Sequence, residues 1–330
     1  MKYLITGITG FAGPHLANLL IKEGHEVYGL VRHSNGREAD IIDIVKDINK
    51  IKFVYSDLNN YITLENIIKE NSFDGIFHLA AQSHPPTSFS DPIGTMGDNV
   101  LGSVNLIEAV RKNSPDTKLM FCSTSEVYGN VGRDKRKIKT TDSIMPANPY
   151  GSSKAAIDIY LQERFNNNFI RGFITRAFSH TGPRRGRTFS ISGDAYQLAH
   201  IKAGKDNCID NFYKQNQLLV GNLDTIRVVM DVRDTVKAYY LLMINDKSDG
   251  KVFNVCGDTP HKMGYYTDIL IEESNTKVEK IIYEKFYRKF DIDYQHGDCE
   301  ELKKLTGWRE EHKIEDTLKD LFKYWVDKIK

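Results

Sequence analysis

A tyrosine and a lysine four residues apart, Tyr150 and Lys154, are the first side chains in this sequence whose types and spacing suggest chemistry. On a helix, residues four apart lie on one face, so the lysine ammonium would lie near the tyrosine phenol. A neighbouring positive charge lowers the pKa of a tyrosine from about 10 and favours the phenolate. Such a tyrosine can take a proton from a hydroxyl group while a hydride leaves the same carbon. Pairs with this spacing also occur by chance on many helices, so other parts of the chain must supply the rest of a site.

A glycine-rich turn near the N-terminus suggests where a hydride acceptor would bind. The run Gly7-Ile8-Thr9-Gly10-Phe11-Ala12-Gly13 follows an expected strand and leads into an expected helix, with Pro14 suited to a first helical position. Its spacing is G-x-x-G-x-x-G rather than G-x-G-x-x-G, and a turn without a ligand is the alternative. Its place at the start of a strand–helix unit favours a dinucleotide pyrophosphate. The expected contacts are Gly7, Thr9, Gly10, Phe11, Ala12 and Gly13.

The end of the expected second strand bears on which dinucleotide binds. An Asp or Glu there would bond the ribose 2′-OH of NAD, but the sequence has no acid between Val31 and Glu38. Arg32, with Ser34 nearby, suits a 2′-phosphate, so we expect NADP; a solvated loop arginine is the alternative. Further cofactor contacts are expected from Asp57 and Leu58 after the third strand, and from Leu79, Ala80, Ala81, Gln82 and Ser83 after the fourth.

The order of elements predicts an α/β fold with a Rossmann-type, doubly wound parallel sheet, because short β-rich runs alternate with helical patterns. We expect a dinucleotide-binding domain over residues 1–178, with returning segments near 226–256, and a smaller substrate-binding lobe mainly over 179–330. Expected strands are Tyr3–Thr6, Glu26–Val31, Lys52–Tyr55, Gly75–Leu79, Leu119–Ser123, Gly172–Arg176 and Val252–Val255. Expected helices are His15–Lys22, Leu64–Asn71, Ser103–Lys112, Lys154–Phe165, Gly193–Ala203 and Ile314–Lys330, and the chain is expected to return to the sheet over Asp231–Ile244.

The composition narrows the class of partner. A net charge of +1, from 45 basic and 44 acidic residues, gives no reason to expect nucleic acid or an anionic membrane. The four cysteines have no metal-ligand or redox spacing, so we expect free thiols and no metal site. No apolar run approaches the ~20 residues that span a bilayer. We therefore expect a soluble, cytoplasmic protein without a signal peptide.

These motifs resemble the extended short-chain dehydrogenase/reductase family. Within it, the chain is most similar to the GDP-mannose 4,6-dehydratases and their relatives that act on GDP-linked sugars. The family likeness is carried by Thr6-Gly7-x-x-Gly10-x-x-Gly13, His78-Leu79-Ala80-Ala81 and Tyr150-x-x-x-Lys154. The closer likeness is carried by Ala81-Gln82-Ser83-His84, Ser123-Thr124-Ser125-Glu126-Val127-Tyr128-Gly129, Pro183-Arg184-Arg185-Gly186, Gly221-Asn222-Leu223-Asp224 and Phe286-Tyr287-Arg288.

The resemblance implies catalytic roles for Thr124, Glu126, Tyr150 and Lys154. Tyr150 would take the proton of the sugar 4-OH as a hydride passes from C4 to NADP⁺, while Lys154 would hold the phenolate and the nicotinamide ribose. Glu126 would remove the C5 proton and then, with Thr124, assist loss of the 6-OH as water. Hydride return to C6 would give a 4-keto-6-deoxy sugar. Judged by themselves, Thr124 could be a plain strand-end residue and Glu126 a solvated or helix-capping one.

The resemblance also implies contacts with the cofactor and the substrate. His180 would lie at the nicotinamide and Arg185 at the adenosine phosphate. A basic surface loop is the alternative for Pro183–Arg187, although three arginines in a nearly neutral chain favour phosphate binding. The loop can reach a neighbouring subunit in this family, so a homodimer or homotetramer is expected. The expected substrate-binding residues are Ser83, Ser125, Ser179, Arg187, Arg227, Arg288 and Asp291.

Three positions bear on the identity of the sugar nucleotide. Ser125 stands where dTDP-glucose 4,6-dehydratases carry Asp, which favours a GDP-sugar. Ser179 stands where the family usually has Asn, and Ile226-Arg227-Val228-Val229 replaces a more usual Arg-Asp-aromatic pattern. The substrate could therefore be GDP-mannose or a related GDP-hexose or GDP-heptose, such as GDP-manno-heptose.

Two other functions are compatible with the sequence. A GDP-4-keto-6-deoxymannose reductase or an epimerase on the same scaffold would also need Tyr150 and Lys154, and such a reductase can also carry a Ser-Ser-Glu strand end. A non-catalytic nucleotide-binding protein is the third hypothesis, because a fold does not fix a function. Thr124 and the arginine loop favour the dehydratase over the reductase, and the complete set of four catalytic residues disfavours a mere binding protein.

Overall fold

A seven-stranded parallel sheet forms the centre of the computed structural model, which describes residues 1–32, 37–205, 209, 216–287 and 290–329. Its strand order is β3-β2-β1-β4-β5-β6-β11. The strands are β1 (Lys2–Thr6), β2 (Glu26–Val31), β3 (Ile51–Tyr55), β4 (Gly75–His78), β5 (Lys118–Thr124), β6 (Gly172–Ala177) and β11 (Val252–Val255). The order reverses between β1 and β4, and ligands of such sheets bind beyond the carboxyl ends of the strands at that point.

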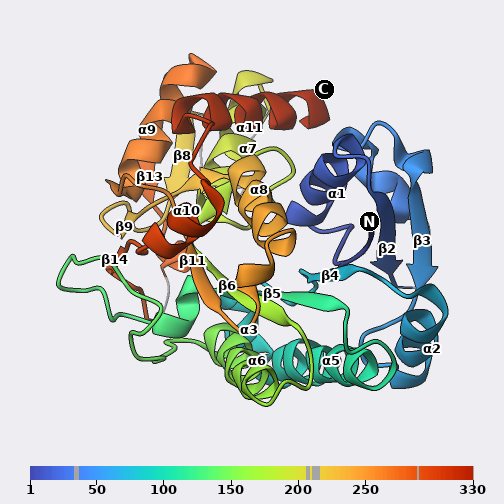
Figure 1. Ribbon diagram of the computed structural model, residues 1–330. Helices are drawn as coiled ribbons and strands as arrows, with labels where there is room; N and C mark the ends of the chain where they lie inside the picture. Colours follow the sequence, from blue (N-terminus) through green and yellow to red (C-terminus); the bar gives the residue numbers. More distant parts are fainter. Residues whose placement is uncertain (33–36, 206–208, 210–215, 288–289, 330) are drawn as a thin grey trace.

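Helices cover both faces of this sheet (Figure 1). On one face lie α1 (Ala12–Lys22) and α8 (Val232–Met243); on the other lie α2 (Tyr61–Asn71), α5 (Gly102–Asn113) and α6 (Pro149–Asn166). Successive side chains of β1 alternate between the two cores: Tyr3 and Ile5 pack with α1 and α8, and Leu4 packs with α2 and α5. Both faces are therefore apolar, as expected for a parallel sheet buried between helices.

The predicted doubly wound sheet is confirmed, and the seven predicted strands match the observed ones to within one residue at each end. The predicted start of the helix at Lys154 is wrong, because α6 begins at Pro149. The side chain of Asn148 caps it by accepting a hydrogen bond from the Gly151 amide, and Pro149 occupies the first turn, where its missing N–H costs nothing. Tyr150 therefore lies in the first turn of α6.

A series of short helical turns between β4 and α5 has no counterpart among the predicted elements. It consists of α3 (Pro85–Ser90), α4 (Pro92–Met96) and the π-helical η3 (Gly97–Leu101). The first two each carry Pro in the first turn, and the Asp91 side chain caps α4 by accepting from Gly94 N. These turns contact α6 and thereby flank the helix that carries Tyr150 and Lys154.

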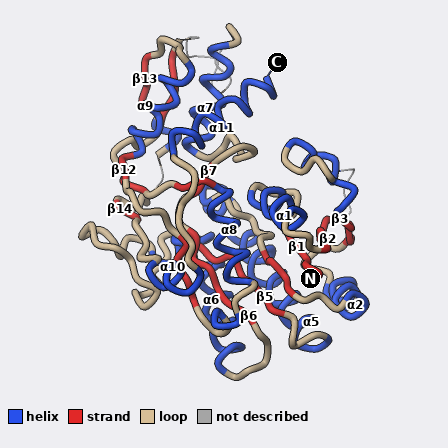
Figure 2. Tube along the Cα trace, turned by 45° about the horizontal axis from the view of Figure 1, so that its top comes forward, coloured by secondary structure: helices blue, strands red, loops and turns tan. Residues whose placement is uncertain are grey.

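A second apolar core lies away from the sheet, where α7 (Ser190–Lys202), α9 (Met263–Ser274) and α11 (Ile314–Ile329) pack together (Figure 2). The strands β8 (Gln217–Val220) and β13 (Glu279–Ile282) pair beside it. Short strands join this part to the sheet: β7 (His180–Thr181) pairs with β10 (Met230–Asp231), and β9 (Ile226–Arg227) lies between β12 (His261–Lys262) and β14 (Tyr294–Gln295). The remaining elements are η1 (Arg37–Asp43), η2 (Ile48–Lys50), η4 (Ser125–Tyr128), η5 (Asp246–Ser248), η6 (Glu284–Phe286) and α10 (Glu300–Thr306).

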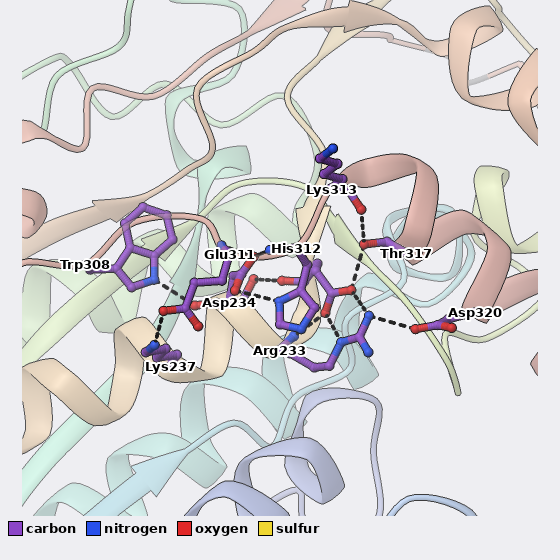
Figure 3. Close-up of polar contacts among 11 residues, drawn as sticks. Arg233, Asp234, Lys237, Trp308, Glu311, His312, Lys313, Thr317 and Asp320 are labelled. Carbon is purple, nitrogen blue, oxygen red and sulfur yellow. Dashed lines mark hydrogen bonds and ion pairs between the residues drawn. The ribbon is translucent and has the colours of Figure 1, made fainter.

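A polar cluster fastens the segment before α11 to the start of α8 (Figure 3). The buried carboxylate of Asp234 accepts hydrogen bonds from the backbone amides of Glu311 and His312 and lies 2.9 Å from Nδ1 of His312. The backbone carbonyl of Asp234 accepts from Nε1 of Trp308. Farther out, Arg233 pairs with Asp320 of α11 at 2.9 Å.

Among the residues that the structure describes, no helix is long and apolar enough to cross a membrane.

We predict that Asp234→Ala lowers the free energy of unfolding by about 2–4 kcal/mol, because it removes a buried carboxylate and leaves two partly buried amide groups and the His312 ring without their acceptor. Asp320→Ala in the same cluster should cost less than about 1 kcal/mol, because that carboxylate is 44% exposed. Denaturant unfolding of both variants tests this expectation. Equal losses of unfolding free energy in the two variants would contradict the larger contribution of the buried Asp234 carboxylate.

Candidate active site

The glycine turn after β1 has the geometry of a pyrophosphate-binding turn. Gly7 has φ +74°, and a Cβ there would lie 2.8 Å from the amide nitrogen of Ala80. A Cβ on Gly13 would lie 2.5 Å from the Gly7 carbonyl oxygen. Helix α1 then begins without a side-chain cap and without an acid in its first turn, so its first N–H groups are suited to an anion. These features fit a bound dinucleotide.

The ends of β1 and β4 are held together by buried polar contacts beside this turn. His78 lies 2.7 Å from the hydroxyl of Thr6 and 2.9 Å from that of Ser103, and the amide of Ala80 donates to Thr6. Gln82 continues the network, since its amide donates to the buried side chain of Asn99, 2.7 Å away. Leu79, Ala80, Ala81 and Gln82 are half-buried there, and Ser83 is exposed.

Tyr150 and Lys154 both lie on α6, as expected, but their electrostatics differ from the prediction. Both side chains are buried, and the Lys154 ammonium donates to the carbonyl oxygen of Cys122, 2.6 Å away. Burial raises the pKa of Tyr150 well above its usual 10, and it lowers the pKa of Lys154. The expectation that Lys154 lowers the pKa of this phenol is wrong here, because burial has the largest effect on that pKa and the groups that lower it are others. The hydrogen bond from Thr124 and the charge of Arg185 act in the lowering direction.

Thr124 and Glu126 lie beside Tyr150 at the carboxyl end of β5. Thr124 hydrogen-bonds the phenol and also accepts from the amide of Glu126, and the Glu126 carboxylate is close enough to raise the pKa of Tyr150 further. Asn148, which the sequence analysis missed, donates from Nδ2 to Glu126 at 2.7 Å while its other side-chain atom caps α6. The Asn-Pro pair that starts a helix was the available signal. One residue thus fixes both Glu126 and the first turn of α6.

A buried ion pair underlies this arrangement. Arg176 of β6 donates through two nitrogens to Asp158 of α6, each bond 2.9 Å, and the two side chains are 3% and 0% exposed. Asp158 also accepts from Ser123 of β5, and Arg176 donates to the hydroxyl of Tyr128. The pair therefore joins β5, β6, α6 and the turn that carries Glu126.

On the expected substrate side, Ser125 and Arg227 are both buried and each has a polar partner. Ser125 donates to the side chain of Gln295 at 3.3 Å, and Gln295 donates back to its carbonyl. Gln295 lies opposite Arg227 in the β14–β9 pair, and Arg227 bonds Asp291 at 3.4 Å. Gln295 was missed in the sequence analysis, because no local pattern distinguishes it.

The arginine loop after β7 reaches the glycine turn. His180 stacks on the ring of Phe11, with ring centroids 5.7 Å apart, and burial and Arg185 lower its pKa to about 4. Arg185 lies over the rings of Phe11 and Phe189, at 4.8 and 3.5 Å. The neighbouring Arg184, rather than Arg185, bonds backbone atoms of the glycine turn.

Other predicted residues lie farther from this group or outside the described part. Arg32 is exposed at the end of β2, and Asp57 and Leu58 are half-buried after β3. Arg187 is exposed and donates to the hydroxyl of Tyr196, and Ser179 is half-buried, its carbonyl accepting from the Met230 amide. Ser34 and Arg288 lie outside the described residues.

Comparison with known proteins identifies the family. The family model described as GDP-mannose 4,6 dehydratase matches residues 4–321. The chain belongs to the GDP-mannose 4,6 dehydratase family. It is 32% identical to the GDP-mannose 4,6-dehydratase of Yersinia enterocolitica over 75% of the chain and 66% of that protein. It is 27% identical to the GDP-6-deoxy-D-mannose reductase of Pseudomonas aeruginosa over 100% of the chain and 98% of that protein.

Solved structures agree with this family and fold. RMD from Pseudomonas aeruginosa, complexed with NADPH, superposes with a TM-score of 0.80 at 25% identity, covering 99% of this chain and 100% of that one. The dTDP-glucose 4,6-dehydratase DesIV from Streptomyces venezuelae, with NAD bound, has a TM-score of 0.83 at 21% identity over 99% and 97% of the two chains. The predicted resemblance is thus confirmed: the protein is an enzyme of the GDP-mannose 4,6-dehydratase type, in a family that includes dehydratases and reductases of GDP-linked sugars.

The buried His78 predicts a pH dependence of stability. Burial lowers the pKa of His78 to about 3, so between about pH 6.5 and 3 the unfolded chain takes up a proton that the folded chain resists. Stability from this group is present above about pH 6.5 and is lost as pH falls, by up to about 1.4 kcal/mol per pH unit. We predict that His78→Asn reduces the slope of the free energy of unfolding against pH in this range by about 1.4 kcal/mol per pH unit, which corresponds to about one proton.

Denaturant titrations at a series of pH values measure that slope. Burial raises the pKa of Asp194 to about 7, which gives a slope of opposite sign, but this term is common to both proteins and cancels in their difference. Parallel curves for the variant and the wild type would contradict the prediction.

Proposed function

We propose that this protein is an NADP-dependent nucleotide-sugar 4,6-dehydratase, a hydro-lyase that converts a GDP-mannose-type sugar to its GDP-4-keto-6-deoxy product. The observation that carries the proposal is the position of Glu126. The Glu126 carboxylate raises the pKa of the Tyr150 phenol, the Glu126 amide donates to Thr124 at the end of β5, and Asn148 donates to the carboxylate at 2.7 Å. A dehydrogenase needs the tyrosine and lysine alone, whereas elimination of water needs a second proton-transfer group beside them.

The residues of the chain divide the proton transfers among them in this proposal. Tyr150 takes the proton of the 4-OH, and Lys154 holds the phenolate. The glycine turn, His180 and Arg185 would hold a nicotinamide dinucleotide, which would supply the acceptor of the C4 hydride and the donor of the hydride to C6. Glu126 removes the C5 proton, which the new 4-ketone makes acidic, and gives it to the departing 6-OH, which leaves as water with help from Thr124. C5 takes up a proton, which balances the one that Tyr150 removed from the 4-OH, so the cofactor is unchanged and the net reaction is loss of one water.

The sugar nucleotide and the dinucleotide are proposed from the sequence together with the relatives. A GDP-hexose, or a GDP-heptose, is favoured because the dehydratase and reductase relatives are named for GDP-linked mannose derivatives. Ser125 supports the same choice, since it stands where dTDP-glucose enzymes carry Asp. Arg227 and Asp291 would hold the nucleotide end, and His180 and Arg185 the cofactor. NADP is favoured by Arg32 and by the NADPH bound in the Pseudomonas aeruginosa structure.

Other predictions about the whole protein are retained as proposals. We propose that residues 1–178, with 226–256, form the dinucleotide domain and that most of 179–330 forms the substrate lobe. Assembly into a homodimer or homotetramer is consistent with the exposed apolar side chains of neighbouring helical elements, Phe89 on α3, Ile93 on α4 and Leu101 on η3. A cytoplasmic location also stays a prediction.

The second candidate is the reductase of a GDP-4-keto-6-deoxymannose. The full-length likeness to the Pseudomonas aeruginosa reductase favours it. An epimerase on the same scaffold is a further alternative. A dehydratase releases water and consumes no cofactor overall, whereas a reductase oxidises one NADPH for each sugar, so the two activities can be distinguished by measurement.

We predict that incubation with GDP-mannose gives a product lighter by one water with no net NADPH oxidation. Mass spectrometry follows the product, and absorbance follows NADPH. Glu126→Gln should lower product formation by about 10²–10⁴-fold, because it removes the base and acid of the elimination. Glu65→Gln on α2, away from this site, is the control and should leave turnover unchanged. Stoichiometric NADPH oxidation with a 4-keto-6-deoxy substrate would contradict the dehydratase proposal and support the reductase.

A separate prediction concerns cofactor choice. Arg32→Asp should weaken NADP⁺ binding by about tenfold or more and leave NAD⁺ binding nearly unchanged, because it replaces a partner of the 2′-phosphate with a repelling charge. Calorimetric titration with both dinucleotides checks this, with Arg136→Asp on a distant surface loop as control. Equal weakening of both would refute the placement of the 2′-phosphate at Arg32.

A further inference from the structure

Arg184 has no role in the proposed reaction, yet its side chain contacts the glycine turn at two carbonyl groups. Its Nε donates to the carbonyl of Gly10 at 3.0 Å, and one Nη donates to the carbonyl of Thr9 at 3.1 Å. The other Nη bonds both oxygens of Asp43, at 2.9 and 3.1 Å, and the carbonyl of Asp40. All three guanidinium nitrogens therefore donate hydrogen bonds, to the turn on one side and to η1 on the other.

Asp43 passes this contact on to the C-terminal helix. The hydroxyl of Tyr324 donates to Asp43 at 3.1 Å, and the ammonium of Lys328 lies 3.3 Å from the same carboxylate. Both residues belong to α11, whose last turns lie toward α1 and the segment after β2 in Figure 1. The side chains of Arg184 and Asp43 are only 14% and 13% exposed, so solvent competes weakly for the pair.

The rest of the arginine loop is fastened in the same way. Nε2 of His15 on α1 lies 2.9 Å from the carbonyl of Pro183. The carbonyl of Arg185 accepts from Ser192 of α7, which in turn accepts from the indole of Trp325 on α11. The loop is thus held at successive residues between the dinucleotide turn and the helices of the second core.

The backbone of Arg184 indicates that its position is enforced. Its φ is +76°, a left-handed conformation that costs free energy for any residue other than glycine. A glycine would adopt this conformation without strain. The arginine side chain is therefore kept at a position where the backbone alone would favour glycine.

Peptide geometry gives the contact a consequence for binding. In a planar trans peptide, the carbonyl and the following N–H point in opposite directions. By holding the carbonyls of Thr9 and Gly10, Arg184 fixes the direction of the amide groups of Gly10 and Phe11. The amide of Phe11 lies at the start of α1, where N–H groups are suited to an anionic ligand.

We propose that Arg184 is a positioning residue that holds the dinucleotide-binding turn in its binding geometry and, through Asp43, ties that turn to α11. The inference rests on the proposed binding of a nicotinamide dinucleotide, but not on the choice between dehydratase and reductase. Arg184 acts through the backbone of the turn, so both NADP⁺ and NAD⁺ depend on it, in contrast to Arg32.

The decisive variant is Arg184→Gly, which keeps the backbone conformation and removes the guanidinium. We expect the dissociation constants of NADP⁺ and NAD⁺, measured by titration calorimetry of the full chain, to rise together by about tenfold or more. The unfolding temperature of the ligand-free protein should fall by only a few degrees, because relief of backbone strain offsets part of the lost contacts. Arg184→Lys keeps the charge but lacks the forked donors. Its dissociation constants should lie between those of the wild type and those of Arg184→Gly.

Tyr324→Phe tests the link to α11, because it leaves the Arg184–Asp43 pair intact. It should raise both dissociation constants about two- to threefold, and it should add nothing in the Arg184→Gly background. Tyr265→Phe is the matched control: its hydroxyl also bonds a carboxylate of α11, Glu315, at 2.9 Å, but away from the glycine turn. It should leave both constants unchanged.

The outcomes separate the proposals. Wild-type affinity in Arg184→Gly overturns the role of Arg184, and equal effects of Tyr324→Phe and Tyr265→Phe overturn the link through Asp43. If the wild-type chain binds neither dinucleotide, the proposed function fails, and the role of Arg184 toward that ligand fails with it.

Discussion

The buried ion pair between Asp158 and Arg176 is the interaction on which the geometry of the site depends. It joins the helix that carries Tyr150 and Lys154 to the strands beside it, and its remaining bonds reach Ser123 and Tyr128 on either side of Glu126. Breaking one partner of such a pair costs about 3–5 kcal/mol, because the other charge stays buried. The pair therefore favours the arrangement in which the helix with the tyrosine and the lysine packs beside the turn with the glutamate.

Burial of that end changes the chemistry of the groups in it. Desolvation raises the pKa of Tyr150 and lowers those of Lys154 and His180, so each is pushed toward its neutral form. The groups that oppose this for Tyr150 are the Thr124 hydroxyl and the charge of Arg185. A reaction that forms a phenolate here relies on such fixed polar partners, because little water is present to stabilise the charge.

The same scaffold supports more than one reaction, and the distinction lies in few residues. The glycine turn, Tyr150 and Lys154 would serve hydride transfer in a dehydratase and in a reductase alike. In the proposed dehydratase, Glu126, which accepts a hydrogen bond from Asn148, would add the proton-transfer group that elimination requires. The arginine loop joins the glycine turn to the second apolar core through Arg184, Asp43 and α11.

The sequence by itself determined what depends on neighbours along the chain. Alternating apolar runs predicted the strands of the sheet to within one residue, and the spacing of Gly7, Gly10 and Gly13 predicted the turn, because strand, turn and helix preferences are local. It also predicted that Tyr150 and Lys154 share a helix, although it placed the helix start too late by overlooking the cap at Asn148.

Only the tertiary structure decided which distant residues meet and how strongly they are desolvated. Gln295 bonds Ser125 across 170 positions, and Arg184 bonds Asp43 across 141, and no local periodicity encodes either partner. The direction of the Tyr150 pKa was likewise unavailable from the sequence. A lysine four residues away argued for a lower value, but burial is a property of the whole fold, and at this site its effect on the phenol is the larger one.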